Sequence, residues 1–148
     1  MTSFFPDLNV WLALSVADHS HSADAWRWMG LLPPDATLIF SRYTQIGLLR
    51  LLTNESVMGD QTLSLRKAWE VYDRWLDDPR VYFYPEPRNA EVAFRTITEP
   101  FAARHASKAV GDCWLLACAK EVPAQLVTFD RALHAFARQL ACAAILPG

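Results

Sequence analysis

The chain has 148 residues, of which 52% are hydrophobic and 20% are charged, and its formal net charge is −2 at pH 7. This length favours a single domain, 1–148, and the composition is typical of a folded globular protein and excludes a disordered one. The weakly acidic balance excludes a globally basic nucleic-acid-binding surface, so a polyanionic partner would need a local basic patch.

The hydrophobic pattern predicts strands that alternate with helices along the chain. Strands are expected at 2–6, 37–40, 81–85, 125–129 and 142–146. Helices are expected at 8–16, 22–32, 44–54, 62–78, 89–98, 111–122 and 131–140. Ser22 and Asn89 are expected to cap their helices, and the stretch 55–61 has the composition of a loop. This alternation predicts an α/β fold with a central, mostly parallel sheet that helices cover on both faces.

No hydrophobic run is long enough to span a membrane, and the N-terminus has neither the basic residues nor the cleavage site of a signal peptide. The three cysteines, Cys113, Cys118 and Cys142, follow neither a disulfide nor a zinc-ligand spacing. We therefore expect a cytoplasmic protein with reduced, buried thiols and no membrane partner.

Three aspartates occupy positions where ligand sites form in such a fold. Asp7 follows the first strand, Asp130 follows the strand QLVTF, and Asp112 opens a helix directly after Gly111. Ligands bind beyond the carboxyl ends of parallel strands, so these carboxylates are expected to lie at one edge of the sheet. Each aspartate also fits a simpler role as a helix cap.

Clustered carboxylates repel one another, and an unpaired buried carboxylate such as that of Asp7 is costly. A hard divalent cation, Mg²⁺ or Mn²⁺, prefers oxygen ligands and would relieve both costs. Such a cation can acidify a water and stabilise phosphate oxygens during in-line displacement. The acids therefore predict a metal-dependent hydrolytic site.

Four segments, taken in order, resemble PIN-domain ribonucleases, most closely the VapC toxins of bacterial and archaeal toxin–antitoxin pairs. They are Asp7-x-Asn9 after the first strand, SRYTQIGLLRLLTN, GDCWLLACA and LVTFDRAL. The resemblance implies a PIN-like three-layer α/β/α sandwich and Mg²⁺- or Mn²⁺-dependent endoribonuclease activity as the toxin of a type II toxin–antitoxin system. It also implies a homodimer, an RNA substrate and a cognate antitoxin protein that binds over the active site.

The same resemblance implies roles for individual residues. Asp7 and Asp112 match the principal metal-ligating, catalytic aspartates, and Asp130 matches the fourth acidic position. Thr128 matches the small hydroxyl residue of the last motif, and Asn9 matches the polar residue that orients the first aspartate.

One position departs from the pattern, because many PIN domains carry a glutamate where this chain has Gln45. The site would then hold three formal negative charges instead of four, and its metal affinity should fall. Gln45 therefore leaves open a catalytically weakened PIN-like module that binds RNA or protein without turnover. A third alternative, a haloacid-dehalogenase-like phosphohydrolase, is suggested by FFPDLNVWL, but that chemistry needs an acid where the chain has Asn9.

Basic residues are scattered, and one group precedes Asp112. Arg104, His105 and Lys108 lie in the segment EPFAARHASKAVGD, where Arg104 and Lys108 are candidates for contact with an RNA backbone. A solvated loop explains the same residues without a ligand. Arg50, in the helix expected at 44–54, fits either a phosphate contact or a structural ion pair. Phosphate contacts would give salt-dependent, largely sequence-independent affinity.

Overall fold

A computed structural model describes residues 2–148 and contains one five-stranded parallel sheet, in the order β3-β2-β1-β4-β5. The strands are β1 (Ser3–Pro6), β2 (Thr37–Phe40), β3 (Val81–Phe83), β4 (Gln125–Val127) and β5 (Ala144–Ile145). The strand order reverses at β1, because β2 and β3 extend the sheet on one side and β4 and β5 on the other. The crevice between β1 and β4 is thus a topological switch point, where open α/β sheets bind their ligands.

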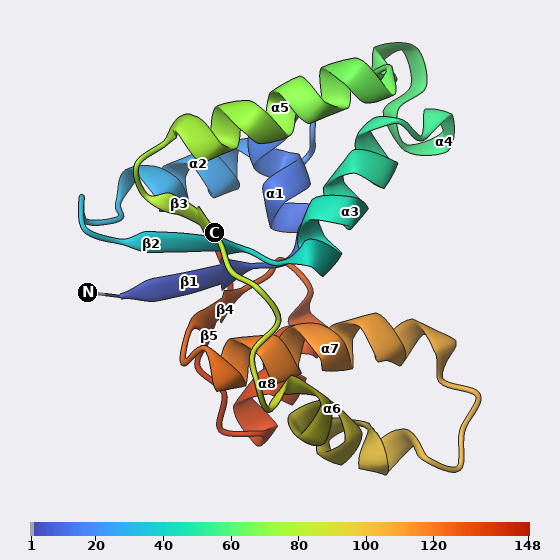
Figure 1. Cartoon of the computed structure of the whole chain (residues 1–148). Coiled ribbons are helices and arrows are strands. Elements are labelled where there is room, and N and C mark those ends of the chain that lie inside the picture. The colour runs from blue at the N-terminus through green and yellow to red at the C-terminus, as the bar shows by residue number, and fades with distance from the viewer. Residues whose placement is uncertain (1) are drawn as a thin grey trace.

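Helices cover both faces of this sheet, which confirms the expected three-layer α/β/α sandwich (Figure 1). One layer contains α1 (Leu8–Ser15), α2 (Ser22–Gly30), α3 (Arg42–Leu52) and α5 (Leu65–Asp77). The other contains α6 (Ala90–Thr98), α7 (Ser107–Glu121) and α8 (Arg131–Gln139). The short helix α4 (Glu55–Met58) and two 3₁₀ turns, Gly59–Gln61 and Glu99–Phe101, complete the structure.

The two faces of the sheet carry separate hydrophobic clusters, because successive side chains of a strand point to opposite faces. In β2, Leu38 and Phe40 pack with α1 and α3, whereas Ile39 packs with α7. Trp11 of α1 stacks on Phe40 with a ring-centroid distance of 3.8 Å. The strands are therefore buried on both sides, as the continuous hydrophobic runs of the sequence predict.

The start of α7 differs from its prediction. The helix begins at Ser107 rather than at Gly111, so Asp112 lies inside the helix and does not cap it. The N-terminal flanking residue, Ala106, makes no side-chain capping bond. Ser107, a residue type common at helix starts, lies at the true boundary, and Lys108 to Val110 continue the helix.

The structure also tests three further predictions, which concern two helix caps and one loop. His21, rather than Ser22, occupies the N-cap of α2, and Ser22 is buried inside the helix. Asn89 occupies the N-cap position of α6, as expected, but its side chain makes no capping bond. The stretch 55–61 is not a loop, because it contains α4 and a 3₁₀ turn. Capping residues in the sequence thus predict that a helix starts within one or two residues, but they do not identify its first residue.

The three cysteines are buried and unbonded to one another, as expected, and burial raises the pKa of Cys118 to about 12. Within residues 2–148, no helix combines the length and hydropathy that crossing a bilayer requires.

The start of α3 is fixed by a capping box, which places the helix at the end of β2. The Thr44 amide donates to Ser41 Oγ at 3.2 Å, and the Ser41 amide donates to Thr44 Oγ1 at 2.9 Å. Both residues are buried, so the bonds are shielded from water.

We predict that Ser41→Ala lowers the free energy of unfolding by about 1–2 kcal/mol, because it removes the accepting oxygen of this cap. Chemical denaturation measures the change. Ser20→Ala is the matched control, since Ser20 is exposed and its loss should change stability by less than about 0.5 kcal/mol. Equal stabilities of the two variants would contradict a structural role for the capping box.

Candidate active site at the carboxyl edge of the sheet

Asp7 lies directly after β1 and is held there by bonds to two other segments. Its backbone amide donates to the Val127 carbonyl at 2.9 Å, which extends the pairing of β1 with β4. Its carboxylate caps α1 by accepting from the Val10 amide at 3.2 Å, and it also accepts from the buried Thr128 hydroxyl at 2.5 Å. The side chain is therefore fixed in position, with only 5% of the residue's surface exposed.

Burial raises the pKa of Asp7 from 3.8 to about 6. The bond from Thr128 and the backbone amides of Val10 and Asn9 lower this pKa, but the nearby negative charge of Asp112 raises it again. None of the ion pairs among residues 2–148 includes Asp7. The carboxylate thus has hydrogen-bond donors but lacks the positive charge that would favour its ionised form.

Thr128 connects two of the predicted site residues. Its hydroxyl donates to Asp7 and accepts from the Asp130 amide at 3.0 Å, so one side chain orients both turns that follow β1 and β4. Asp130 caps α8 by accepting from the Leu133 amide at 3.0 Å, which confirms its capping role. The bond to Asp7 that was expected from the Asn9 side chain is made by Thr128, and Asn9 is exposed.

Asp112 approaches the same edge from α7. It is half-buried, and its pKa is raised by burial and by the negative charge of Asp130. Asp112 in turn raises the pKa of Asp7. The negative charge of Asp130 therefore affects Asp112, and that of Asp112 affects Asp7. The structure thus places the three predicted carboxylates, which follow β1, lie in α7 and follow β4, within electrostatic range of one another.

The donor set at this edge suits a hard divalent cation, because it consists of oxygens whose charges repel one another. Among residues 2–148, no three His, Cys, Asp or Glu side chains converge closely enough to form a ready-made metal site. The arrangement is therefore one of three carboxylates in electrostatic range, with Asp7 fixed and Asp130 at the surface. Assignment of these residues as metal ligands stays a prediction.

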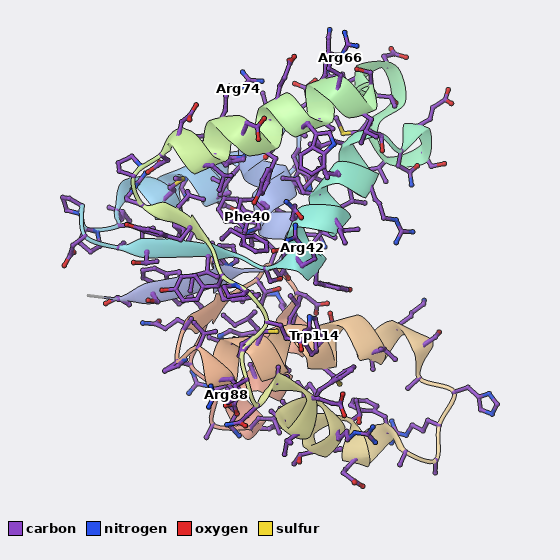
Figure 2. The ribbon with its side chains drawn as sticks, in the orientation of Figure 1. Phe40, Arg42, Arg66, Arg74, Arg88 and Trp114 are labelled. Atoms are coloured by element: carbon purple, nitrogen blue, oxygen red, sulfur yellow. The ribbon has the colours of Figure 1, made fainter. Side chains whose placement is uncertain are left out.

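Gln45 is buried on α3 and is engaged by its own helix. Its Oε1 accepts from the Arg42 guanidinium at 2.6 Å, and the Gln45 side chain also lowers the pKa of Tyr72 through a hydrogen bond to the phenol oxygen. Arg42, at the start of α3 where the two helical layers meet (Figure 2), lies 4.5 Å from the centroid of the Phe83 ring. The carbonyl oxygen that Gln45 offers in place of a glutamate thus already accepts one hydrogen bond, from Arg42, and carries no charge.

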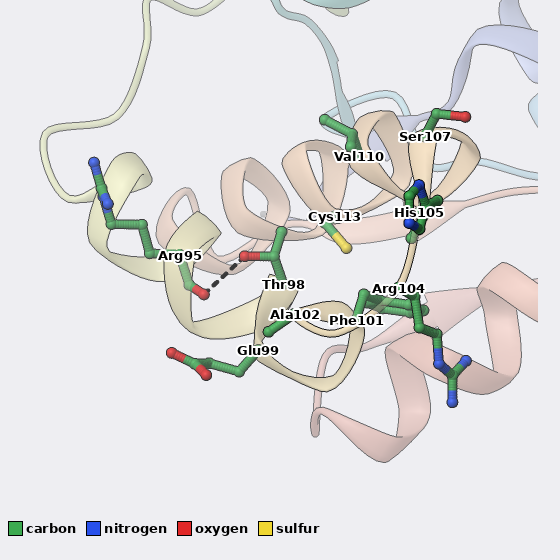
Figure 3. A pocket seen from close by; sticks show the side chains of 12 residues that line it. Arg95, Thr98, Glu99, Phe101, Ala102, Arg104, His105, Ser107, Val110 and Cys113 are labelled. Atoms are coloured by element: carbon green, nitrogen blue, oxygen red, sulfur yellow. Dashed lines mark hydrogen bonds between the residues drawn. The ribbon is translucent and has the colours of Figure 1, made fainter.

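The two candidates for RNA contact lie on different sides of α7. Lys108 is exposed one turn before Asp112, and this spacing places both on one face of the helix. Arg104 lies 5.9 Å above the Phe101 ring and lines a cavity of about 530 Å³, into which Cys113 points (Figure 3). Lys108 therefore borders the acidic edge, whereas Arg104 borders a separate cavity between α6 and α7.

One residue at this edge was not foreseen. The Tyr43 hydroxyl lies so close to α7 that a Cβ atom at Gly111 would stand 2.1 Å from it. Burial raises the pKa of Tyr43, and the charge of Asp112 raises it further. A glycine inside a helix often marks such a close approach, but Gly111 was expected at the very start of its helix, so this signal was not recognised.

We predict that Asp7→Asn stabilises the metal-free protein at neutral pH. Because the pKa of Asp7 rises to about 6 on folding, the wild type loses stability as the pH rises through 6. The loss amounts to about 3 kcal/mol at pH 7, and asparagine avoids it while still capping α1. Thermal unfolding in EDTA at pH 4 and pH 7.5 should show a gain for the variant at pH 7.5 only.

Asp35→Asn provides the control for this experiment, since Asp35 is exposed. A stability difference between Asp7→Asn and the wild type that is the same at both pH values would contradict the raised pKa.

Comparison with known proteins identifies the family. The PIN domain model matches residues 4–139. Ribonuclease VapC41 of Mycobacterium tuberculosis is 37% identical over 132 residues, which cover 85% of this chain and 88% of that protein. The family match leaves the haloacid-dehalogenase-like alternative without support.

Solved structures show the same fold. VapBC2 from Rickettsia felis, bound to a DNA fragment from its promoter, has a TM-score of 0.70 at 12% identity and covers 99% of this chain and 100% of that chain. Mycobacterium tuberculosis VapC20, described as a sarcin–ricin loop cleaving toxin, has a TM-score of 0.64 at 18% identity and covers 89% and 93%. With its sheet order, its acidic edge and its VapC relatives, this chain belongs to the PIN-domain family and is a VapC-type member of it.

Proposed function

We propose that this protein is a Mg²⁺- or Mn²⁺-dependent endoribonuclease and the toxin of a type II toxin–antitoxin system. The observation that carries the proposal is the buried Asp7 carboxylate, which lies at the switch point beside Asp112 and lacks a cationic partner. The ribonuclease relative VapC41 supports hydrolysis of RNA, and the VapBC2 neighbour supports an antitoxin partner. A homodimer remains part of the same proposal.

Asp7, Asp112 and Asp130 would hold the cation, since their oxygens are the hard ligands at the edge. The bound cation would supply an acidified water and offset the charge of the phosphate oxygens. Thr128 keeps the Asp7 carboxylate in one orientation and so reduces the reorganisation that ligand binding would require. Lys108, one turn before Asp112, is placed to attract the RNA backbone toward the acids.

A second candidate function rests on Gln45. Gln45 contributes no charge to the edge, and its carbonyl oxygen is held by a hydrogen bond from Arg42. A PIN-like module that binds RNA or protein but turns over slowly would have this property. Metal binding and cleavage must therefore be measured separately.

We predict that purified protein cleaves total cellular RNA into discrete fragments with Mg²⁺ or Mn²⁺, and that EDTA abolishes cleavage. Asp112→Asn should lower the rate about 100-fold or more, because metal stabilisation of the transition state is worth several kcal/mol. Asp35→Asn, on the exposed turn before β2, should cleave like the wild type. Cleavage that persists in EDTA and in Asp112→Asn would exclude the metal-dependent mechanism.

We also predict that Mn²⁺ raises the unfolding temperature of the wild type at pH 7.5. A ligand present at 100 times its dissociation constant stabilises the folded state by about 2.7 kcal/mol. Asp7→Asn removes a ligand charge and should show a much smaller shift, whereas Asp35→Asn should match the wild type. A shift in the wild type without cleavage would favour the binding module, and equal shifts in all three proteins would exclude Asp7 as a ligand.

A further inference from the structure

A groove of about 670 Å³ runs along the exposed face of α3 and begins at Tyr43, beside the acidic edge. Its floor is formed where α1 meets α3. A Cβ atom at Gly47 would stand 2.6 Å from the Leu8 side chain, so the missing side chain lets Leu8 lie against α3. The groove extends from Tyr43 past Arg50 to Asn54.

Tyr43 joins this groove to the acidic edge. Its hydroxyl lies against α7 at Gly111, where the glycine leaves room for it, while 41% of the residue's surface stays exposed. The negative charge of Asp112 and the positive charge of Arg50 both act on its pKa. The ring therefore stands between a carboxylate of the proposed site and a basic residue of the groove.

The spacing along α3 places three solvent-facing side chains on one side of the helix. Tyr43, Ile46 and Arg50 are separated by three and four residues, so they follow one another along a single face. All three are exposed and line the groove. Among residues 2–148, Arg50 takes part in none of the ion pairs, so its charge is available to a ligand.

We propose, on the basis of the ribonuclease function proposed above, that Tyr43 is a stacking platform for an unpaired RNA base next to the cleaved phosphate. Arg50 would bind a neighbouring phosphate along the groove. Bases of single-stranded RNA stack on aromatic side chains with little dependence on sequence, and arginine neutralises the backbone beside them. The substrate at this position is therefore single-stranded, because a base inside a duplex cannot reach the ring.

Two other roles for Tyr43 make different predictions. A purely structural bridge from α3 to α7 would depend on the hydroxyl that lies at Gly111, not on the ring face. A groove that receives a protein segment would require apolar volume rather than an aromatic face. Tyr43→Phe keeps the ring without the hydroxyl, and Tyr43→Leu keeps apolar volume without the ring, so the two variants separate these roles.

The probe is a fluorescein-labelled, mixed-sequence, single-stranded RNA of 12 nucleotides, with binding measured by anisotropy in EDTA so that no turnover is needed. Tyr43→Leu should bind about 10-fold more weakly than the wild type, since stacking of one base is lost. Tyr43→Phe should recover most of that loss. Equal binding by Tyr43→Leu and the wild type, or an equal loss in Tyr43→Phe and Tyr43→Leu, would overturn the proposal.

Arg50→Gln should weaken binding of the same probe. It should also reduce the slope of log affinity against log salt concentration by about 1, the change expected when one phosphate contact is lost. Its matched control is Arg74→Gln, because Arg74 projects from the outer face of α5, away from the sheet (Figure 2). Arg74→Gln should leave both affinity and slope unchanged. An unchanged salt slope in Arg50→Gln would remove Arg50 from the proposal.

The stacking platform and the ribonuclease activity can fail independently, and the experiments distinguish the two failures. If the wild type cleaves RNA and Tyr43→Leu has the same KM, the stacking platform fails while the ribonuclease stands. If the wild type does not cleave but Tyr43→Leu loses RNA affinity, the ribonuclease fails while the stacking platform stands. Should Tyr43→Leu not fold, Tyr43→Trp replaces it and must bind at least as tightly as the wild type, because tryptophan keeps a stacking face.

Discussion

The buried carboxylate of Asp7 is the constraint around which the carboxyl edge of the sheet is organised. It lies where β1 ends, and its neighbours are arranged to hold it: the Val10 amide from α1 and the Thr128 hydroxyl from the turn after β4. These donors lower its pKa without overcoming burial, so a charge at this place stays costly. The divalent cation proposed above would offset this cost, because it would supply the positive charge that the buried carboxylate lacks among residues 2–148.

Much of this arrangement is local, and local patterns predict it. The strands β1 and β2 are continuous hydrophobic runs, and the aspartates that follow β1 and β4 are also good helix caps. Alternation of strands and helices implies a parallel sheet, and a parallel sheet brings the ends of its strands to one edge. Asp7 and Asp130 could therefore be placed from the sequence alone.

The remaining features depend on contacts between distant segments. Asp112 was expected at the start of a helix, but α7 already begins at Ser107, so Asp112 lies within the helix. The bond between Thr128 and Asp7 joins residues 121 positions apart, and the approach of Tyr43 to Gly111 joins two helical layers. The hydrogen bond from Arg42 to Gln45 joins residues only three positions apart. It could still not be predicted, because both side chains have other possible partners, and only the folded structure shows which bond forms.

The position of β1 in the middle of the sheet has a consequence for synthesis of the protein. β1 is made long before one of its two neighbours, β4, because β2, β3 and their helices lie between the two in the sequence. A nascent chain can therefore pair β1 with β2 while Asp7 still lies at an open edge in water, with neither Thr128 nor Asp130 yet made. The acidic edge is completed only after β4 and the turn that follows it have been made, so a translation product that stops before Asp130 lacks one of the three acids.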